Sequence, residues 1–318
     1  MSGRPPEPVR DLRALRSLEP AGVRLAVAGW PVRHSLSPPM HRAALESLSA
    51  LDPAFAGWTY GAYELRPEEL PEAVALFRER GFRGVNLTVP HKVEVLPLVD
   101  VVDPVAERMA AVNTLLFDGG CLRGFNSDGY GLERAVEEAF GAGLRGRPVL
   151  LLGAGGAARA AAVQCVESGA SRLWIANRTV GKAETIAARI REDAPAGAGR
   201  GRTPVTALPA EQAPATVPPG TLVINATSLG LARADPLPVE VEALPAGCRL
   251  FDMIYNPSET PFLAAGRQRG CPTANGLGML VHQGVRSLEI WTGRRVDARI
   301  MREACGKALG LARTDRGG

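Results

Sequence analysis

Two ionisable side chains stand where acid–base chemistry is possible. Lys92 follows the apolar stretch Gly84-Val-Asn-Leu-Thr-Val-Pro90, and it is one of three lysines among 37 basic residues. Arginine keeps its proton at working pH, whereas a partly buried lysine can act as a general acid or base. A solvated surface lysine is the alternative interpretation. Asp128 lies in Asn126-Ser-Asp-Gly129, which also suits a simple turn, so this aspartate is ambiguous by itself.

A glycine-rich turn indicates a nucleotide site. The apolar run 148–152 leads into Gly153-Ala-Gly-Gly-Ala-Ala158, which matches the strand–turn–helix fingerprint G-x-G-x-x-G/A. The first glycine allows the tight turn, the second lets backbone approach a pyrophosphate, and the third small residue lets the helix pack closely on the strand. A glycine turn with a purely structural role is the alternative.

The next expected strand ends at Asn177-Arg-Thr179. Folds that bind NAD usually place an acidic residue about 20 positions after the glycines, where it binds the ribose 2′-hydroxyl. Here the position holds Arg178, whose guanidinium can bind the 2′-phosphate of NADP, while Asn177 and Thr179 supply neutral donors. The alternative is an arginine that is merely solvated.

The elements that position these residues alternate between strands and helices. This alternation predicts an α/β protein with a doubly wound, Rossmann-type domain and a second α/β domain, with an active-site cleft between them. Ser37 is placed to cap the first long helix, with Pro38 and Pro39 in its first turn. Strands are expected over 24–29, 58–65, 84–90, 112–117, 121–125, 148–152, 172–176, 204–207, 221–225 and 249–253; helices are expected over 40–51, 66–77, 104–111, 130–140, 278–292 and 297–311.

Three segments follow from this order. Residues 1–22 are rich in arginine and proline and predict a mobile tail. Residues 23–127 form a substrate-binding and catalytic domain, which residues 278–318 complete because the last two helices have no strand to follow. Residues 128–277 form the nucleotide-binding domain, in which 194–220 is expected to be mostly surface loop around one strand.

Composition excludes several classes of protein. The 318 residues suggest about two domains, and 46% hydrophobic with 22% charged residues is ordinary for a globular protein. The formal net charge of +4 is dispersed, so small anionic ligands are expected rather than nucleic acid. The five cysteines form no C-x-x-C pair, which predicts neither disulfides nor a metal site. No apolar run approaches the roughly 20 residues that span a bilayer, so no membrane contact is expected, and the unpaired cysteines fit a reducing, cytoplasmic location.

With these features in hand, the chain closely resembles the shikimate 5-dehydrogenases, which interconvert 3-dehydroshikimate and shikimate with NADPH. The resemblance covers nearly the whole chain after the tail. Eight motifs in family order carry it: His34-Ser-Leu-Ser-Pro38, Asn86-Leu-Thr-Val-Pro-His-Lys92, Ala111-Val-Asn-Thr-Leu115, Asn126-Ser-Asp-Gly129, Gly153-Ala-Gly-Gly-Ala-Ala-Arg159, Asn177-Arg-Thr179, Asn225-Ala-Thr-Ser-Leu-Gly230 and Asn275-Gly-Leu-Gly-Met-Leu280.

The resemblance implies a role for each site residue. Lys92 and Asp128 would form the catalytic pair that handles the proton as hydride leaves or joins carbon. Ser35, Ser37 and Tyr255 would bind the substrate carboxylate, while Asn86, Thr88, Asn113 and Gln283 would hold the ring hydroxyls. NADP(H) would lie against Gly153, Ala154, Gly155, Gly156, Ala157, Asn177, Arg178, Thr179, Thr227, Gly276 and Met279. The resemblance gives His34 and His41 structural roles, and His91 beside the lysine has no assigned part.

The implied function is the NADPH-dependent, reversible reduction of 3-dehydroshikimate to shikimate, in the route to chorismate and the aromatic amino acids, by a monomer or homodimer. Two alternatives stay open. A relative could act on quinate, or on quinate and shikimate, with NAD; an acidic residue near Arg178 would favour it. A nucleotide-binding module without catalysis would instead bind NADPH and turn nothing over. The departures from the family pattern, such as Arg42 and Phe125, touch no residue assigned to catalysis.

Overall fold

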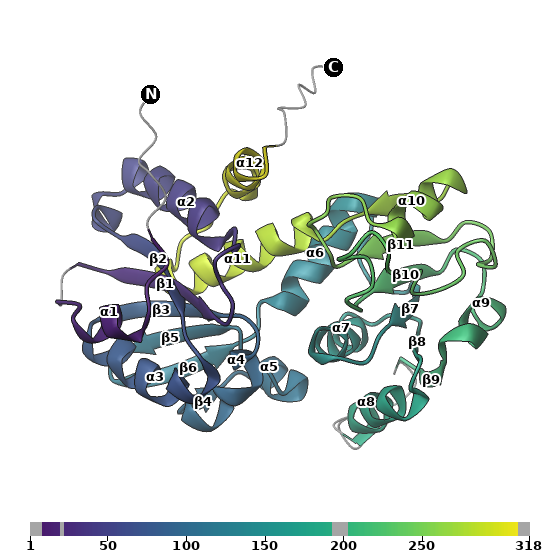
Figure 1. Ribbon diagram of the computed structural model, residues 1–318, viewed down its shortest axis with the longest axis horizontal. Helices are drawn as coiled ribbons and strands as arrows, with labels where there is room; N and C mark the ends of the chain where they lie inside the picture. Colours follow the sequence, from purple (N-terminus) through teal and green to yellow (C-terminus); the bar gives the residue numbers. More distant parts are fainter. Residues whose placement is uncertain (1–7, 20–21, 193–202, 311–318) are drawn as a thin grey trace. The chain divides into compact units, whose positions relative to one another are not determined.

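The computed structural model describes residues 8–19, 22–192 and 203–310. These residues divide into two compact units (Figure 1). The first unit combines the described residues up to Ser127 with those from Gln283 onward, and the second unit runs from Asp128 to His282. Each unit contains its own six-stranded sheet.

The sheet of the first unit has the strand order β2-β1-β3-β5-β6-β4. Its strands are β1 (Arg24–Gly29), β2 (Thr59–Glu64), β3 (Phe82–Leu87), β4 (Val101–Val102), β5 (Thr114–Asp118) and β6 (Cys121–Phe125). β1 pairs in parallel with β2 and β3, whereas β5 runs antiparallel to both β3 and β6. The ends of β1 and β3 therefore lie at one edge of the sheet, where open α/β sheets bind ligands.

Helices pack around this sheet. They are α1 (Leu12–Arg16), α2 (Ser37–Leu51), α3 (Leu70–Glu79), α4 (His91–Glu94), α5 (Pro104–Met109) and α12 (Ala298–Ala308), together with the part of α11 (Leu277–Thr292) from Gln283 onward. α12 packs against α2, with Cys305 Sγ 3.8 Å from Met40 Sδ. Trp291 of α11 donates its indole N–H to Leu115 O at 2.8 Å, which ties this helix to β5.

The prediction that Ser37 caps α2 is wrong. The helix begins at Ser37 itself, its N-cap is Leu36, and no capping bond from the Leu36 side chain exists. Pro38 and Pro39 do lie in the first turn, as expected, since proline loses no hydrogen bond there. The hydroxyl of Ser37 is thereby left for contacts inside the unit.

The prediction of a mobile tail over residues 1–22 is also wrong for the part that the structure describes; residues 1–7 and 20–21 lie outside it. Leu12 and Leu15 in α1 are 5% and 0% exposed and join the core of the first unit. Arg10 pairs with the end of β2, where its N–H donates to Ala62 O at 3.0 Å and its carbonyl accepts from Glu64 N at 2.8 Å. A five-residue helix is too short to produce a hydrophobic period in the sequence.

The sheet of the second unit is parallel, with the strand order β12-β11-β10-β7-β8-β9. Its strands are β7 (Pro148–Leu152), β8 (Arg172–Asn177), β9 (Val205–Pro209), β10 (Leu222–Asn225), β11 (Arg249–Asp252) and β12 (Thr273–Ala274). From β7 the chain builds outward to β8 and β9, then returns to the other side of β7 for β10 to β12. This doubly wound order confirms the predicted fold class and creates a switch point between β7 and β10.

The helices of the second unit are α6 (Asp128–Phe140), α7 (Gly156–Glu167), α8 (Val180–Glu192), α9 (Ala213–Thr216) and α10 (Pro261–Gln268). α7 and α8 lie on one face of the part of the sheet formed by β7, β8 and β9, and α9 lies on the other face (Figure 1). In the stretch 194–220, for which the sequence predicts mostly loop, the described part holds β9, a 3₁₀ turn over Ala210–Gln212 and α9. Residues 193–202 lie outside the described ranges.

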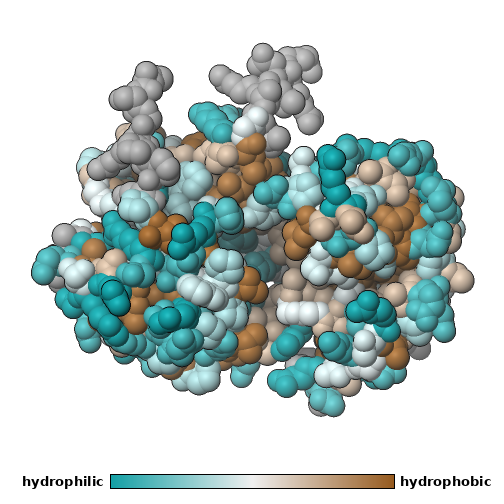
Figure 2. Space-filling model, in the orientation of Figure 1, coloured by the Kyte–Doolittle hydropathy of each residue, from teal (hydrophilic) through white to brown (hydrophobic). Residues whose placement is uncertain are grey.

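The surface of each unit is largely hydrophilic on the face that Figure 2 shows, with hydrophobic side chains in small groups. Within the described ranges, no helix is both long enough and apolar enough to cross a membrane.

We expect Leu15→Ala to lower the free energy of unfolding by about 2–5 kcal/mol, because it removes buried methyl groups from a packed core. Chemical denaturation of the full chain measures this change. Leu51→Ala is the matched control, because Leu51 is 82% exposed and its truncation leaves no cavity. Equal stability of the two variants would mean that α1 does not contribute to the core.

Candidate functional site

The turn after β7 has the backbone shape that the glycine motif predicts. Gly153 has a φ of 111°, a region that favours glycine, and its N–H donates to Ala176 O at 2.8 Å. A Cβ at this position would lie 3.0 Å from Thr227 Cγ2 and 3.1 Å from Ala226 O. The turn therefore brings β7 close to the segment after β10, at the switch point of the sheet.

The start of α7 faces open space. Gly155 is its N-cap and provides no side-chain cap, and a Cβ added to Gly155 or Gly156 would meet no atom within 4 Å. Ala154 and Ala157 lie in the same turn, and Ala158 is fully buried where the helix packs on the sheet. The first N–H groups of a helix attract anions, so this turn fits the pyrophosphate of a dinucleotide.

Cationic and neutral polar groups follow β8. Asn177 Nδ2 donates to Thr179 O at 2.9 Å and shapes the turn, while Arg178 and Thr179 are exposed. A second cation, Lys182, is exposed in the first turn of α8, and Arg178 lies two residues before that helix. No acidic side chain occurs between Asn177 and Lys182.

Thr227 follows β10 and is held by Asn225. Both its N–H and its Oγ1 donate to Asn225 Oδ1, at 3.0 and 2.7 Å. Asn225 is fully buried and donates through Nδ2 to Asp252 Oδ1 at 3.1 Å. Burial raises the pKa of Asp252, against hydrogen bonds from Thr260, Ile254 N–H and Asn225 that lower it. This cluster fixes the segment opposite the glycine turn.

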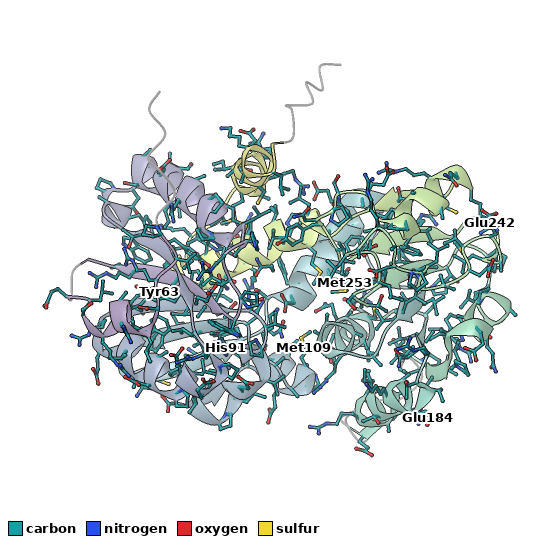
Figure 3. The ribbon with its side chains drawn as sticks, viewed as in Figure 1. Tyr63, His91, Met109, Glu184, Glu242 and Met253 are labelled. Atoms are coloured by element: carbon teal, nitrogen blue, oxygen red, sulfur yellow. The ribbon has the colours of Figure 1, made fainter. Side chains whose placement is uncertain are left out.

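Gly276 and Met279 lie at the start of α11. Gly276 donates its N–H to Ile254 O at 3.0 Å, and a Cβ there would lie 2.1 Å from Met253 O, so no larger residue fits. Met279 is half-buried in the first turn of the helix. Met253, labelled in Figure 3, and the half-buried Tyr255 follow β11. The predicted cofactor residues thus lie at or just after the ends of strands of the second sheet, or in the first turn of a helix.

In the first unit, the two predicted carboxylate-binding serines are neighbours. Ser35 is half-buried, and its Oγ accepts a hydrogen bond from Ser37 N–H at 3.2 Å. Ser37 is 6% exposed at the start of α2. The loop is closed by Ser35 N–H, which donates to Val32 O at 3.0 Å. Tyr255, the third residue of this predicted group, belongs to the second unit.

The predicted hydroxyl-binding residues gather in the first unit. Asn86 on β3 is 4% exposed, and Thr88 beyond the end of this strand is half-buried, with its N–H donating to Ala28 O at 2.9 Å. Asn113, just before β5, is 2% exposed, and its carbonyl oxygen accepts from Asn86 Nδ2 at 3.2 Å. Gln283 of α11 is 9% exposed.

Lys92 and Asp128 fall in different compact units. Lys92 is half-buried in α4. Its carbonyl oxygen accepts a hydrogen bond from the N–H of Val112 at 2.7 Å. This bond ties the backbone of Lys92 to the residue that precedes Asn113. Asp128 is half-buried as the first residue of α6, directly after Ser127. The structure describes each of the two within its own unit, and their pairing stays a prediction.

Two of the histidines, His41 and His91, have structural surroundings. His41 is fully buried, with Nδ1 2.9 Å from Ser37 O and its ring stacked on Tyr60 at 4.1 Å. Burial lowers the pKa of His41 to about 4, so the ring is neutral at pH 7. His91 (Figure 3) is also buried, and its Nε2 lies 2.9 Å from Leu65 O. His34 is exposed.

The five cysteines are free thiols, and the described residues hold no group of three His, Cys, Asp or Glu side chains that could bind a metal ion.

Family models match three parts of the chain. Residues 27–115 match the shikimate dehydrogenase substrate binding domain, residues 134–197 match the shikimate/quinate 5-dehydrogenase model, and residues 276–305 match the shikimate 5′-dehydrogenase C-terminal domain.

Individual relatives agree with the family models. The chain is 40% identical over 291 residues to a shikimate dehydrogenase (NADP(+)) from Moorella thermoacetica, which covers 90% of this chain and 95% of the relative. It is similar to the crystal structure of shikimate 5-dehydrogenase from Thermus thermophilus in complex with NADP(H) and shikimate, with a TM-score of 0.78 and 38% identity over 91% of this chain and 100% of the other. A quinate dehydrogenase from Corynebacterium glutamicum in complex with NAD is 29% identical, with a TM-score of 0.77 over 89% of this chain and 98% of the other.

Proposed function

Because the chain belongs to the shikimate dehydrogenase family, we propose that it catalyses the reversible, NADP-dependent reduction of 3-dehydroshikimate to shikimate. One observation carries this proposal: the glycine turn after β7 fits a dinucleotide, and the cations after β8, without an acid, suit a 2′-phosphate. The cofactor and the substrate are both small molecules.

The second unit supplies the cofactor contacts in this proposal. The turn from Gly153 to Ala157 and the first N–H groups of α7 would hold the pyrophosphate. Arg178, with Asn177 and Thr179, would hold the 2′-phosphate. The remaining contacts are Thr227, Gly276 and Met279. When bound, the nicotinamide ring carries the hydride.

The first unit supplies most of the substrate contacts. Ser35 and Ser37, joined by Tyr255 of the second unit, bind the carboxylate, and the ring hydroxyls are held by Asn86, Thr88, Asn113 and Gln283. All seven of these residues are half-buried or buried, so an analogue that lacks a hydroxyl would leave a buried polar group without a partner. The cost of that lost bond gives the site its specificity.

Lys92 and Asp128 act on the proton. When shikimate is oxidised, the reacting hydroxyl loses its proton as hydride leaves the same carbon, and an ammonium–carboxylate pair can orient that hydroxyl and accept the proton. In the direction of reduction, the same pair returns a proton to the oxygen as hydride adds to the carbonyl carbon.

The reaction is tested by following NADP and NAD reduction with shikimate and with quinate in parallel. We expect shikimate with NADP to give the highest kcat/KM. Faster turnover of quinate with NAD would replace this proposal with a quinate dehydrogenase. Tight NADPH binding without turnover of either substrate would indicate a nucleotide-binding module.

Lys92→Ala should lower kcat by about 100- to 10,000-fold while KM for shikimate changes far less, as expected for a group that acts mainly in the transition state. Steady-state kinetics in both directions measure this. Lys307→Ala, which changes an exposed lysine of α12, is the control and should behave as wild type. A kcat near the wild-type value would remove Lys92 from the proton transfer.

Arg178→Ala should raise KM for NADP by about 10- to 100-fold, because charge-assisted hydrogen bonds to the phosphate are lost. KM for NAD should change much less, since NAD lacks that phosphate. Arg172→Ala, at the opposite end of β8, is the matched control. Equal increases for the two cofactors would refute the role of Arg178 at the 2′-phosphate.

A further inference from the structure

Four buried hydroxyl groups lie behind the predicted substrate contacts and have no role in the function proposed above. They belong to Tyr60, Thr114, Ser127 and Ser287, whose exposures are 1%, 0%, 1% and 0%. The oxygens of Thr114 and Ser287 are 2.8 Å apart, those of Ser127 and Ser287 3.1 Å, and those of Thr114 and Ser127 3.3 Å. β2, β5, the segment after β6 and α11 thus each contribute one hydroxyl.

Asn86 is held by three of these hydroxyls. Its Oδ1 accepts from the Tyr60 hydroxyl at 2.8 Å, and its Nδ2 lies 2.9 Å from Ser287 Oγ and 3.2 Å from Thr114 Oγ1. Nδ2 also donates to the carbonyl oxygen of Asn113 at 3.2 Å. A carbonyl oxygen can only accept, so this contact determines which end of the amide is nitrogen.

The direction of the Ser287 hydrogen bond agrees with that assignment. Its Oγ donates to the carbonyl oxygen of Gln283, one helical turn earlier, at 3.0 Å. With its proton used there, Ser287 Oγ is an acceptor for Asn86 Nδ2. Both N–H groups of Asn86 therefore point into the unit, and the second lone pair of Oδ1 is what the side chain can offer to a ligand.

Asn113 is fixed in the same way. Its Oδ1 accepts from the backbone N–H of Ser127 at 2.8 Å, and a backbone N–H can only donate. Thr114 Oγ1 donates to the same oxygen at 2.8 Å, and Asn113 Nδ2 donates to Ser127 Oγ at 3.0 Å. A rotated amide would place its nitrogen against the Ser127 N–H, so the orientation is unique.

Tyr60 joins this cluster to Ser37 at the start of α2. Its hydroxyl donates to Asn86 and is also hydrogen-bonded by the side chain of Ser37. Burial raises the pKa of Tyr60 well above its usual value, so the phenol keeps its proton as a donor. The ring of His41, neutral at pH 7, stacks on the phenol with an interplanar angle of 11° and holds it in place.

We infer that Tyr60, Thr114, Ser127 and Ser287 are positioning residues that fix the hydrogen-bond polarity of the substrate site. They hold Asn86 so that a ring hydroxyl of the substrate donates to Asn86 Oδ1, and they hold Asn113 in a single amide orientation. This inference rests on the proposed function, which brings a polyhydroxylated ring to these two amides.

The test compares two variants that lose a hydroxyl with one that keeps it. Tyr60→Phe and Thr114→Val should raise KM for shikimate by about 10- to 100-fold, because a misplaced buried amide no longer matches the ring hydroxyl. KM for NADP should stay within about twofold in both. Thr114→Ser, which retains the hydroxyl, should restore KM for shikimate to near the wild-type value.

Thr221→Val is the matched control for the loss of a buried threonine hydroxyl. Thr221 is fully buried in the second unit, and its Oγ1 donates to Pro218 O at 2.7 Å. This variant should lose stability but keep the wild-type KM for shikimate. The inference is overturned if Tyr60→Phe and Thr114→Val keep that KM, or if Thr114→Ser is as impaired as Thr114→Val.

A second measurement separates this inference from the proposed function. In protein labelled with ¹⁵N at asparagine side chains, the Asn86 amide protons should exchange with water at least about tenfold faster in Thr114→Val than in Thr114→Ser. Wild-type enzyme that does not turn over shikimate would refute the proposed function alone. Equal exchange rates in the two variants would refute the positioning role, whatever the substrate.

Discussion

Buried polar groups must find hydrogen-bond partners, and the first unit is organised by that constraint around Asn86. An amide that is 4% exposed cannot leave its N–H groups unpaired without a cost of about 1–3 kcal/mol. Its partners come from β2, β5 and α11, so these elements must all be in place before the amide is satisfied. Ser287 lies 201 positions after Asn86 in the chain. The cluster thus ties the end of the chain to its beginning, and the ligand-facing geometry follows from the same bonds that stabilise the core.

In the second unit, the surface that fits a dinucleotide is made of backbone N–H groups rather than of buried side chains. Gly153 permits the close approach to Thr227, and the start of α7 presents N–H groups toward open space. Such a site fits the part that dinucleotides share, so the proposed function leaves the choice between them to the exposed cations after β8. In that proposal, recognition of the substrate is built into a core, whereas cofactor preference depends on a few surface residues and is the easier of the two to change by substitution.

The sequence predicted best what is encoded locally. The run 148–152 and its glycine turn are a contiguous signal, β7 has the expected bounds, and a helix follows the turn as expected. The helix α1 escaped prediction because five residues carry no readable hydrophobic period. The positioning hydroxyls could not be predicted, since no local pattern distinguishes Ser287 from any other helical serine. The roles of Lys92, Asp128 and the substrate contacts stay predictions.

The pairing of Arg10 with β2 bears on how the protein behaves in solution. β2 is the outer strand of its sheet, and an outer strand offers backbone groups on which a foreign chain can add. Here the Ala62 carbonyl and the Glu64 N–H are already occupied by Arg10. The segment around Arg10 therefore covers part of the β2 edge and blocks pairing with another chain there. A truncation that removes all residues before β1 would expose these backbone groups. A tag added ahead of the N-terminal segment would keep Arg10 and its pairing with β2.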